Sequence, residues 1–332
     1  MIIYPTEVIH QSVFYLVGEI EKCLSAAFSS GFNGVLRKIK IITDSCADLN
    51  EKLLREYDID YAQMRTVFEG KETPASLTMT DEEFHDLYNI MRDKKRITTT
   101  QVPTEEFMKV FSKYLEEGYD IVYIGCSGKS SGSINTGYVV SQKLLEKYQD
   151  AKIYCIDSLN CSIGEGILAI EAAKFVREGF DIDYINDKIT LMRKKLNQFV
   201  TVHSLDALKR AGRVKGSAAF FGNLMGVKPI IIADVNGDQA AFKKVKGREN
   251  SFREIVALLK DAMINPEEQT VYIAHGDCDA EEINALKEII QENINCKAIE
   301  VVYIGPIVGA SIGPDAIGVW GFGKEVTFKI GD

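Results

Sequence analysis

From Lys38 onward, short apolar runs alternate with segments whose apolar residues recur at helical spacing. In the first half, the apolar runs predict strands over 38–43, 61–68, 120–125 and 151–157. The segments between them predict helices over 50–57, 81–92, 104–117, 131–147, 163–178 and 183–197. Parallel strands need long crossover connections, which are usually helices. The pattern therefore predicts an α/β fold with a mostly parallel sheet covered by helices.

The second half follows the same alternation less regularly. It predicts strands over 199–204, 227–234, 239–246, 270–277, 298–305 and 319–330, and helices over 250–264 and 279–293. Asn236-Gly237 lies between two of these strands and is typical of a tight hairpin turn. We therefore expect two α/β domains, over 39–198 and 199–332, with a boundary near 196–200.

Residues 1–38 differ from the rest of the chain. Apolar residues from Val8 to Leu24 recur at helical spacing, and Thr6 is a suitable N-cap. The segment is expected to be an N-terminal helical extension. Two roles remain open for it: an extra helix packed on the rest of the protein, or a contact through which two copies form a homodimer.

The composition disfavours several classes of protein. The chain has 332 residues, 46% of them hydrophobic, so it can bury sizeable cores. Its formal net charge of −9 disfavours nucleic acid as a general partner, because the phosphate backbone requires a dense positive surface. No apolar run approaches the ~20 residues that span a bilayer. The seven cysteines lack CxxC spacing, so we expect reduced core thiols in a cytoplasmic protein, with no metal site and no cofactor.

A loop rich in glycine and serine follows the strand predicted at 120–125. Its sequence GKS, at 128–130, matches the end of a nucleotide-binding P-loop, but the first glycine of that motif is replaced by Tyr123. ATP binding at this loop is therefore not expected. The remaining hydroxyls, among them Ser127 and Ser131, suit either a helix cap or the binding of an acidic head group.

Eight short motifs occur in order along the chain. They are IITDSCADL (41–49), TTTQVPTEEF (98–107), SGKSSGSINTGYVVSQ (127–142), CIDSLNCSIGEGILAIEAA (155–173), LDALKRAGRV (205–214), GNLMGVKPII (222–231), AHGD (274–277) and GPIVGASIGPDAIGV (305–319). Each motif is weak alone. Together, from about residue 38 to 330, they resemble the bacterial DegV family.

The resemblance implies two α/β domains with a ligand cleft between them, and a long-chain fatty acid or related lipid as the ligand. It implies a binding protein without chemistry of its own, which in several members presents the acid to a fatty acid kinase subunit. The residues expected to hold the head group are Thr99, Thr100, Ser127, Gly128, Ser131 and Ser311. Arg213 matches an arginine associated with kinase docking, but an arginine beside a helix C-terminus also fits this position.

The chain departs from the family pattern at the head-group site. Gly128 replaces one hydroxyl of a Ser-Ser pair, and Lys129 follows it. Ser311 replaces a histidine, and Asp315 replaces a glycine. A second carboxylate beside a ligand carboxylate costs on the order of 1–4 kcal/mol. We expect either a lipid held by an altered site, with Lys129 as one source of charge, or a regulatory or structural relative that has lost its ligand.

A small phosphotransferase or hydrolase using the loop at 125–133 is the remaining alternative. Such an enzyme needs an acid–base pair, a metal cluster or a nucleophile elbow, and the sequence shows none of these clearly. Asp44 and Ser45 follow the first predicted strand, where ligands of open α/β sheets gather, but they also suit a turn and a helix cap. No catalytic residue is therefore assigned.

Overall fold

The computed structural model describes residues 37–203, 206–216 and 226–330. Its first half contains a four-stranded sheet in the order β2-β1-β6-β7, with every neighbouring pair parallel. The strands are β1 (Lys38–Asp44), β2 (Ile59–Ala62), β6 (Tyr119–Gly125) and β7 (Ile153–Asp157). This confirms the α/β fold and the mostly parallel N-terminal sheet.

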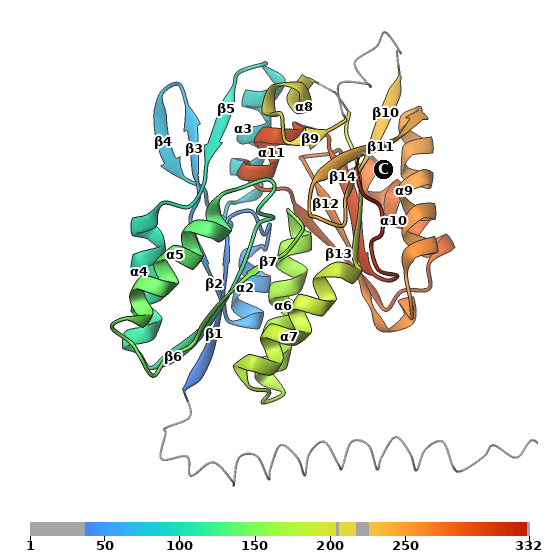
Figure 1. The fold of residues 1–332 in the computed structure, drawn as a ribbon. Coiled ribbons are helices and arrows are strands. Elements are labelled where there is room, and N and C mark those ends of the chain that lie inside the picture. The colour runs from blue at the N-terminus through green and yellow to red at the C-terminus, as the bar shows by residue number, and fades with distance from the viewer. Residues whose placement is uncertain (1–36, 204–205, 217–225, 331–332) are drawn as a thin grey trace, which may run out of the picture. The chain divides into compact units, whose positions relative to one another are not determined.

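Helices cover both faces of the parallel sheet (Figure 1). They are α2 (Glu51–Tyr57), α4 (Thr104–Glu116), α5 (Ser133–Leu145), α6 (Ile163–Arg177) and α7 (Ile182–Met192). Successive side chains of a strand point to opposite faces. Ile42 accordingly packs in one cluster with α4 and α5, whereas Ile41 packs in another with α2, α6 and α7. Because both faces are covered, β1 and β6 carry buried apolar residues on both of their faces.

A separate antiparallel sheet, β4-β3-β5, interrupts the expected order. Its strands are β3 (Arg65–Phe68), β4 (Lys71–Pro74) and β5 (Ile97–Thr100), and α3 (Asp81–Arg92) precedes β5. The single strand predicted over 61–68 is therefore wrong. The chain leaves the parallel sheet at Met64, whose N–H donates to Ser45 Oγ at 2.7 Å and whose carbonyl accepts from Ala75 N at 2.9 Å.

The second half is built on a seven-stranded mixed sheet in the order β13-β12-β14-β8-β10-β11-β9. Its strands are β8 (Leu196–Thr201), β9 (Val214–Lys215), β10 (Val227–Ala233), β11 (Gln239–Lys246), β12 (Thr270–His275), β13 (Ala298–Tyr303) and β14 (Ile317–Phe322). Helices α9 (Arg248–Ala262) and α10 (Ala280–Asn293) cover one face. The hairpin predicted at Asn236-Gly237 is confirmed, and Gly237 has the positive φ, 83°, that such a turn requires.

Two predicted boundaries are wrong. The helix predicted over 183–197 ends at Met192, and β8 already begins at Leu196. At the C-terminus, β14 ends at Phe322, so the strand predicted over 319–330 is too long. Beyond it, the backbone N–H groups of residues 323 and 326 donate to the carbonyls of residues 195 and 194, which precede β8.

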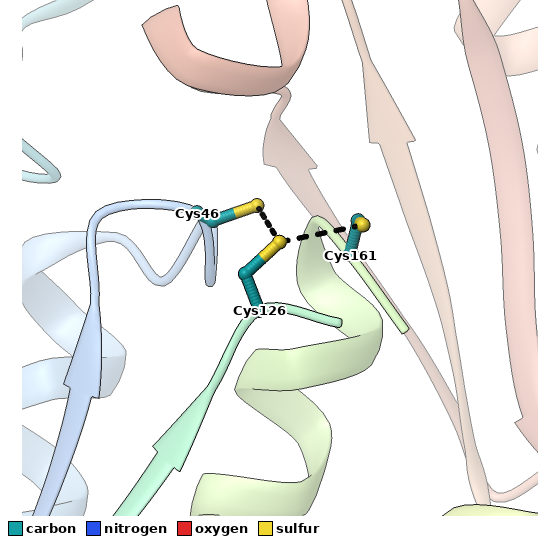
Figure 2. Close-up of side chains that lie close together, drawn as sticks. All are labelled: Cys46, Cys126 and Cys161. Carbon is teal, nitrogen blue, oxygen red and sulfur yellow. Dashed lines mark hydrogen bonds between the residues drawn. The ribbon is translucent and has the colours of Figure 1, made fainter. Parts of the chain in front are cut away.

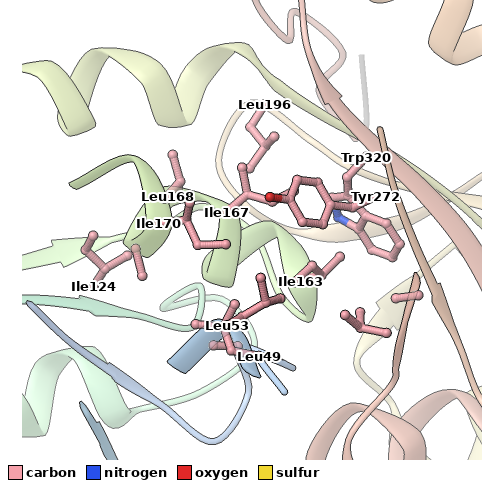
Figure 3. Packing of buried hydrophobic residues seen from close by; sticks show 14 of the residues in the cluster. Leu49, Leu53, Ile124, Ile163, Ile167, Leu168, Ile170, Leu196, Tyr272 and Trp320 are labelled. Carbon is pink, nitrogen blue, oxygen red and sulfur yellow. The ribbon is translucent and has the colours of Figure 1, made fainter. Parts of the chain in front are cut away.

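The inner face of the seven-stranded sheet shares one apolar core with α6 (Figure 3). Trp320 and Tyr272 of the sheet belong to the same buried cluster as Ile163 and Ile167 of the helix. The indole Nε1 of Trp320 also donates to Asn160 Oδ1 at 3.2 Å, just before α6. The two sheets are thus joined through one helix that is buried along most of its length.

The short helix α11 (Pro306–Ile312) was not predicted, whereas α8 (Asp206–Ala211) ends two residues before Arg213 and so agrees with the helix C-terminus considered for that residue. Helix α11 contacts α8, α3 and β5. It begins at Pro306, contains Gly309 and is followed directly by Gly313 and Pro314, a composition typical of a loop. Packing against these neighbours therefore stabilises a helix that its own sequence does not favour.

The division into domains over 39–198 and 199–332 stays a prediction. The chain passes from the parallel to the mixed sheet at β8. The helical extension predicted over 1–38, and with it the proposed homodimer contact, lies almost entirely outside the described residues. Among the helices that are described, none is long and apolar enough to cross a membrane.

His275 at the end of β12 should make the stability of this fold depend on pH. It is 5% exposed, its Nδ1 accepts from Cys278 N at 3.3 Å, and burial lowers its pKa from 6.5 to about 4. Between these pH values only the unfolded chain binds the proton. The free energy of unfolding should therefore fall as the pH drops, with this residue contributing a loss of about 3 kcal/mol by pH 4.

The matched variant is His275→Asn, which keeps an acceptor for Cys278 N but has no proton to bind in this range. Denaturant titrations from neutral pH down to pH 4 should show a smaller loss of stability in the variant than in the native chain. Equal losses in the two proteins would contradict the assignment to His275.

Candidate functional site

The loops after β1 and β6 are held together by one buried carboxyl group. Asp44 Oδ1 accepts from Cys46 N at 2.9 Å, and its Oδ2 accepts from the Tyr123 hydroxyl at 2.8 Å and from Cys126 N at 3.2 Å. Burial raises the pKa of Asp44 to about 6, although these hydrogen bonds act in the opposite direction. The position of both loops therefore depends on a side chain that has no contact with bulk water.

Two further buried carboxyl groups secure the same edge of the sheet. Glu165 accepts from Thr43 Oγ1 at 2.6 Å, and Asp48 accepts from the Ser162 hydroxyl and from Gly305 N at 2.8 Å. Burial raises the pKa of Asp48 to about 8 and the pKa of Glu165 well above its usual range. Glu165 was missed at the sequence level, because a single carboxyl in an apolar helix carries no local signal of its partner.

A cavity of about 190 Å³ lies beside these loops, and residues from both halves of the chain line it. Its apolar wall consists of Met64, Val200, Val214, Ile231, Ile304, Ile307, Val308, Ile312 and Trp320. An apolar cavity of about 150 Å³ is enough to hold a benzene molecule. The cavity therefore has room for a stretch of hydrocarbon.

A second cavity, of about 260 Å³, adjoins the first. The two share Thr99, Arg213 and Ser311 as lining residues. The second cavity is also lined by the exposed basic residues Lys95, Arg96 and Arg210. An apolar space thus meets a positively charged one at a wall that carries two hydroxyls and a guanidinium.

Four of the expected head-group residues line the apolar cavity. They are Thr99 and Thr100 from β5, Ser131 from the loop before α5, and Ser311 from α11. Thr100 Oγ1 donates to Glu72 Oε1 at 3.2 Å, so this hydroxyl is already engaged. Arg213, expected at a docking surface, lies at the same cavity, and its Nη1 donates to the carbonyl of residue 211 at 3.0 Å.

Ser127 and Gly128 are not brought to the cavity. The Ser127 hydroxyl donates to Gly237 O at 2.8 Å, and Gly128 N donates to Asp157 Oδ2 at 3.1 Å. A Cβ at Gly237 would lie 2.5 Å from Ser127 Oγ, so the hairpin turn approaches this loop closely. Ser127 and Gly128 therefore fix the loop after β6 in place, whereas the other four expected residues line the cavity.

Asp315 lies away from the cavity wall and is paired with a cation. Its Oδ1 accepts from Arg92 at 2.7 Å, and Arg92 also donates to Asp277 Oδ2 at 2.6 Å. Its φ of 60° explains why a glycine suits this position in the family pattern. Asp315 does not line the apolar cavity, so it does not exert the expected repulsion on a carboxylate bound there.

Two glutamines of the cavity wall were also missed at the sequence level. Gln198 Nε2 donates to Gln239 Oε1, which leaves Gln198 Oε1 and Gln239 Nε2 buried without a protein partner among the described residues. The two side chains are 41 positions apart and come from strands on either side of β10. No local sequence pattern predicts such a pair.

Comparison with known proteins identifies the family of the chain. A family model described as "Uncharacterised protein, DegV family" matches residues 38–323. The chain belongs to the DegV family. It is 34% identical, over 290 residues, to a DegV domain-containing protein of Clostridium perfringens, covering 87% of this chain and 98% of the relative. This confirms the family that the eight motifs predicted.

Solved DegV structures share the fold. A DegV lipid-binding protein of Thermotoga maritima has a TM-score of 0.75 at 25% identity, covering 87% of this chain and all of its own. A fatty-acid-binding DegV family protein of Thermus thermophilus has a TM-score of 0.77 at 21% identity, covering 86% of this chain and all of its own. At 21% identity, the comparison with the Thermus thermophilus protein shows only that the two proteins share a fold.

The glutamine pair predicts a non-additive effect on stability. Gln239→Leu alone should lower the free energy of unfolding by about 1–3 kcal/mol, because it leaves the buried amide of Gln198 without its partner. The double variant Gln198→Leu/Gln239→Leu should recover most of that loss. Urea denaturation of the native chain, both single variants and the double variant gives the coupling energy. Losses that simply add would show that the two amides do not interact.

Proposed function

We propose that this DegV chain binds a long-chain fatty acid or a similar acyl ligand. The hydrocarbon chain occupies the apolar cavity, and the carboxylate lies at the wall formed by Thr99, Arg213 and Ser311. The observation that carries this proposal is that the apolar cavity and the basic cavity share this wall. The ligands named for the relatives from Thermotoga maritima and Thermus thermophilus support the same chemical class.

The energetics favour a ligand with a long apolar part. Each methylene removed from water contributes ~0.8 kcal/mol, so a hydrocarbon chain needs few polar contacts. Hydrogen bonds from hydroxyl and guanidinium donors to a carboxylate contribute about 1.5–3 kcal/mol each. Arg213 and the neighbouring basic residues supply the positive charge that Ser311 lacks, which supports an altered head-group site over a lost one. Lys129 lines neither cavity.

We further propose that the chain is a carrier rather than an enzyme. Among the described residues, no histidine lines either cavity, so the hydroxyls there have no imidazole base to activate them. The buried acids Asp44, Asp48 and Glu165 lie outside both cavity walls and accept hydrogen bonds from neighbouring backbone N–H and hydroxyl groups. Free thiols at the cavity suit a reducing compartment, and we place the protein in the bacterial cytosol.

Removing hydroxyls from the shared wall tests the head-group site. The double variant Thr99→Val/Ser311→Ala should bind a fatty acid at least about a hundredfold more weakly, because two donors to the carboxylate are lost, each contributing about 1.5–3 kcal/mol. Binding is measured by displacement of a fluorescent fatty acid and by mass spectrometry of lipid retained during purification. Thr66→Val is the matched control, since Thr66 lies on the neighbouring strand β3 and lines neither cavity. Unchanged lipid affinity in the double variant would refute this position for the head group.

Presentation of the acid to a kinase subunit is a second part of the proposal, and Arg213 is its candidate contact. The residue is exposed and lines the basic cavity as well as the apolar one. Its planar guanidinium is well suited to a phosphate or an acidic surface. Arg213→Ala should therefore weaken binding of the lipid-loaded protein to a bacterial fatty acid kinase subunit by about tenfold.

Lipid content is measured on the same Arg213→Ala sample, so that loss of ligand is not mistaken for loss of docking. Arg253→Ala is a control, because Arg253 lies on α9 and lines neither cavity. A loaded Arg213→Ala protein that binds the kinase subunit as tightly as the native chain would restrict Arg213 to the head-group site.

A further inference from the structure

Three thiols that are far apart in the sequence lie together at the cavity wall (Figure 2). Cys46 Sγ is 3.3 Å from Cys126 Sγ, which is 3.5 Å from Cys161 Sγ, and all three sulfur atoms lie within 4.8 Å of one another. The three residues belong to the loops that follow β1, β6 and β7. The spacings of 80 and 35 positions explain why no sequence motif reveals the cluster.

The spacing of the sulfur atoms suits a metal ion. Thiolates lie about 2.3 Å from a tetrahedral zinc ion, which places their sulfur atoms about 3.8 Å apart. The two short separations at Cys126 need to lengthen by less than an ångström to reach this value. The sulfur atoms of Cys46 and Cys161 lie within 4.8 Å of each other and must also reach this separation, so ion binding requires the thiol side chains to rotate.

The loops that carry the thiols are already fixed by hydrogen bonds. Asp44 accepts from the backbone N–H groups of both Cys46 and Cys126. Cys161 N donates to Asn160 Oδ1 at 3.1 Å, and the same oxygen accepts from the indole of Trp320. A site whose ligands are held in place before the ion arrives loses little conformational entropy on binding.

We propose that Cys46, Cys126 and Cys161 bind a thiophilic divalent cation of the Zn²⁺ class, with the fourth coordination position open to the cavity. Soft thiolate ligands select Zn²⁺ and Cu⁺ over the alkaline-earth ions. Three thiolates and a divalent ion leave one negative charge, whereas a monovalent ion leaves two. The smaller charge is favoured, because Cys46 and Cys126 are only 2% exposed and a buried net charge is costly.

The open position follows from where the thiols lie. All three line the cavity, as do Ser130 and Ser131 on the same loop as Cys126. Zinc sites with three protein ligands keep a fourth position for water or for an oxygen of a bound molecule. The cation site does not depend on the identity of the cavity ligand. The proposal of this site is therefore tested independently of the proposal of a fatty acid carrier.

The experiment uses the full chain, purified under reducing conditions, stripped with a chelator and returned to metal-free buffer. Titration with Zn²⁺ against a chromophoric chelator should show about one tightly bound ion per chain. Titration with Cd²⁺ should produce an ultraviolet thiolate-to-metal charge-transfer band that saturates at the same ratio. Elemental analysis of the protein before stripping shows which ion it carries from the cell.

The variants separate this site from other thiols. Cys161→Ser should weaken Zn²⁺ binding at least tenfold and abolish most of the Cd²⁺ band, and it should fold, because Cys161 is partly exposed. Cys126→Ser should have a similar effect, with folding checked by circular dichroism. Cys296→Ser is the matched control: this partly exposed thiol lies outside the cluster, and its replacement should leave both titrations unchanged.

Two outcomes would overturn the proposal. One is a native chain that binds neither Zn²⁺ nor Cd²⁺ more tightly than Cys161→Ser does, which would make the three thiols ordinary core residues. The other is a chain that is two hydrogen atoms lighter by intact mass and carries no metal, with Cys126 joined to a neighbour. That result would assign the cluster to a disulfide.

Discussion

The geometry of the cavity depends on the burial of the Asp44 carboxyl group between two loops. Its two oxygens accept from Cys46 N, Cys126 N and the Tyr123 hydroxyl, so one side chain joins the ends of β1 and β6. Without it, three donors would be left in an environment with no water to bind them, and each such group costs about 1–3 kcal/mol. The loops that line the cavity are therefore fixed by the carboxyl group of Asp44, which does not itself line the cavity.

Asp48 extends this constraint across the molecule. By accepting from Gly305 N, it links the loop after β1 to the residue that precedes α11, the helix that carries Ser311. Ser162, which donates to the same carboxyl, lines the cavity. The apolar core shared by α6 and the seven-stranded sheet acts together with these hydrogen bonds, because Trp320 belongs to that core and also forms part of the cavity wall. The cavity is thus a space left between elements that are fixed independently of any ligand.

Such a space suits a ligand that is mostly hydrocarbon with one acidic end. The apolar wall can bury a hydrocarbon chain without requiring directional contacts, and the basic residues around Arg213 place positive charge at one end of the cavity. The departures from the family pattern have a consistent explanation in these terms. The negative charge of Asp315 is paired with Arg92. The positive charge that a histidine at position 311 could carry is supplied at the same wall by Arg213.

The order of apolar and polar residues was sufficient to predict β1, β6, β10, β12 and most of the long helices, since the strands are short apolar runs and the helices repeat apolar residues at helical spacing. The ordered motifs were sufficient to predict the family. They also singled out Thr99, Thr100, Ser131 and Ser311, which line the cavity, while the role of these residues toward a ligand stays a prediction. The same information did not predict the break at Met64, which depends on the hydroxyl of Ser45. It also placed Ser127 and Gly128 among the head-group residues, although their partners are Gly237 and Asp157.

The features that were missed have one physical cause in common. The thiol cluster, the Gln198–Gln239 pair and the Arg92–Asp315 ion pair each join side chains that are between 35 and 223 positions apart. Periodicity along a chain reports which face of an element is buried, but it carries no information on what lies opposite that face. The fold class and the family therefore follow from the residues in order, whereas the partners of each polar group follow from the packing of one element against another.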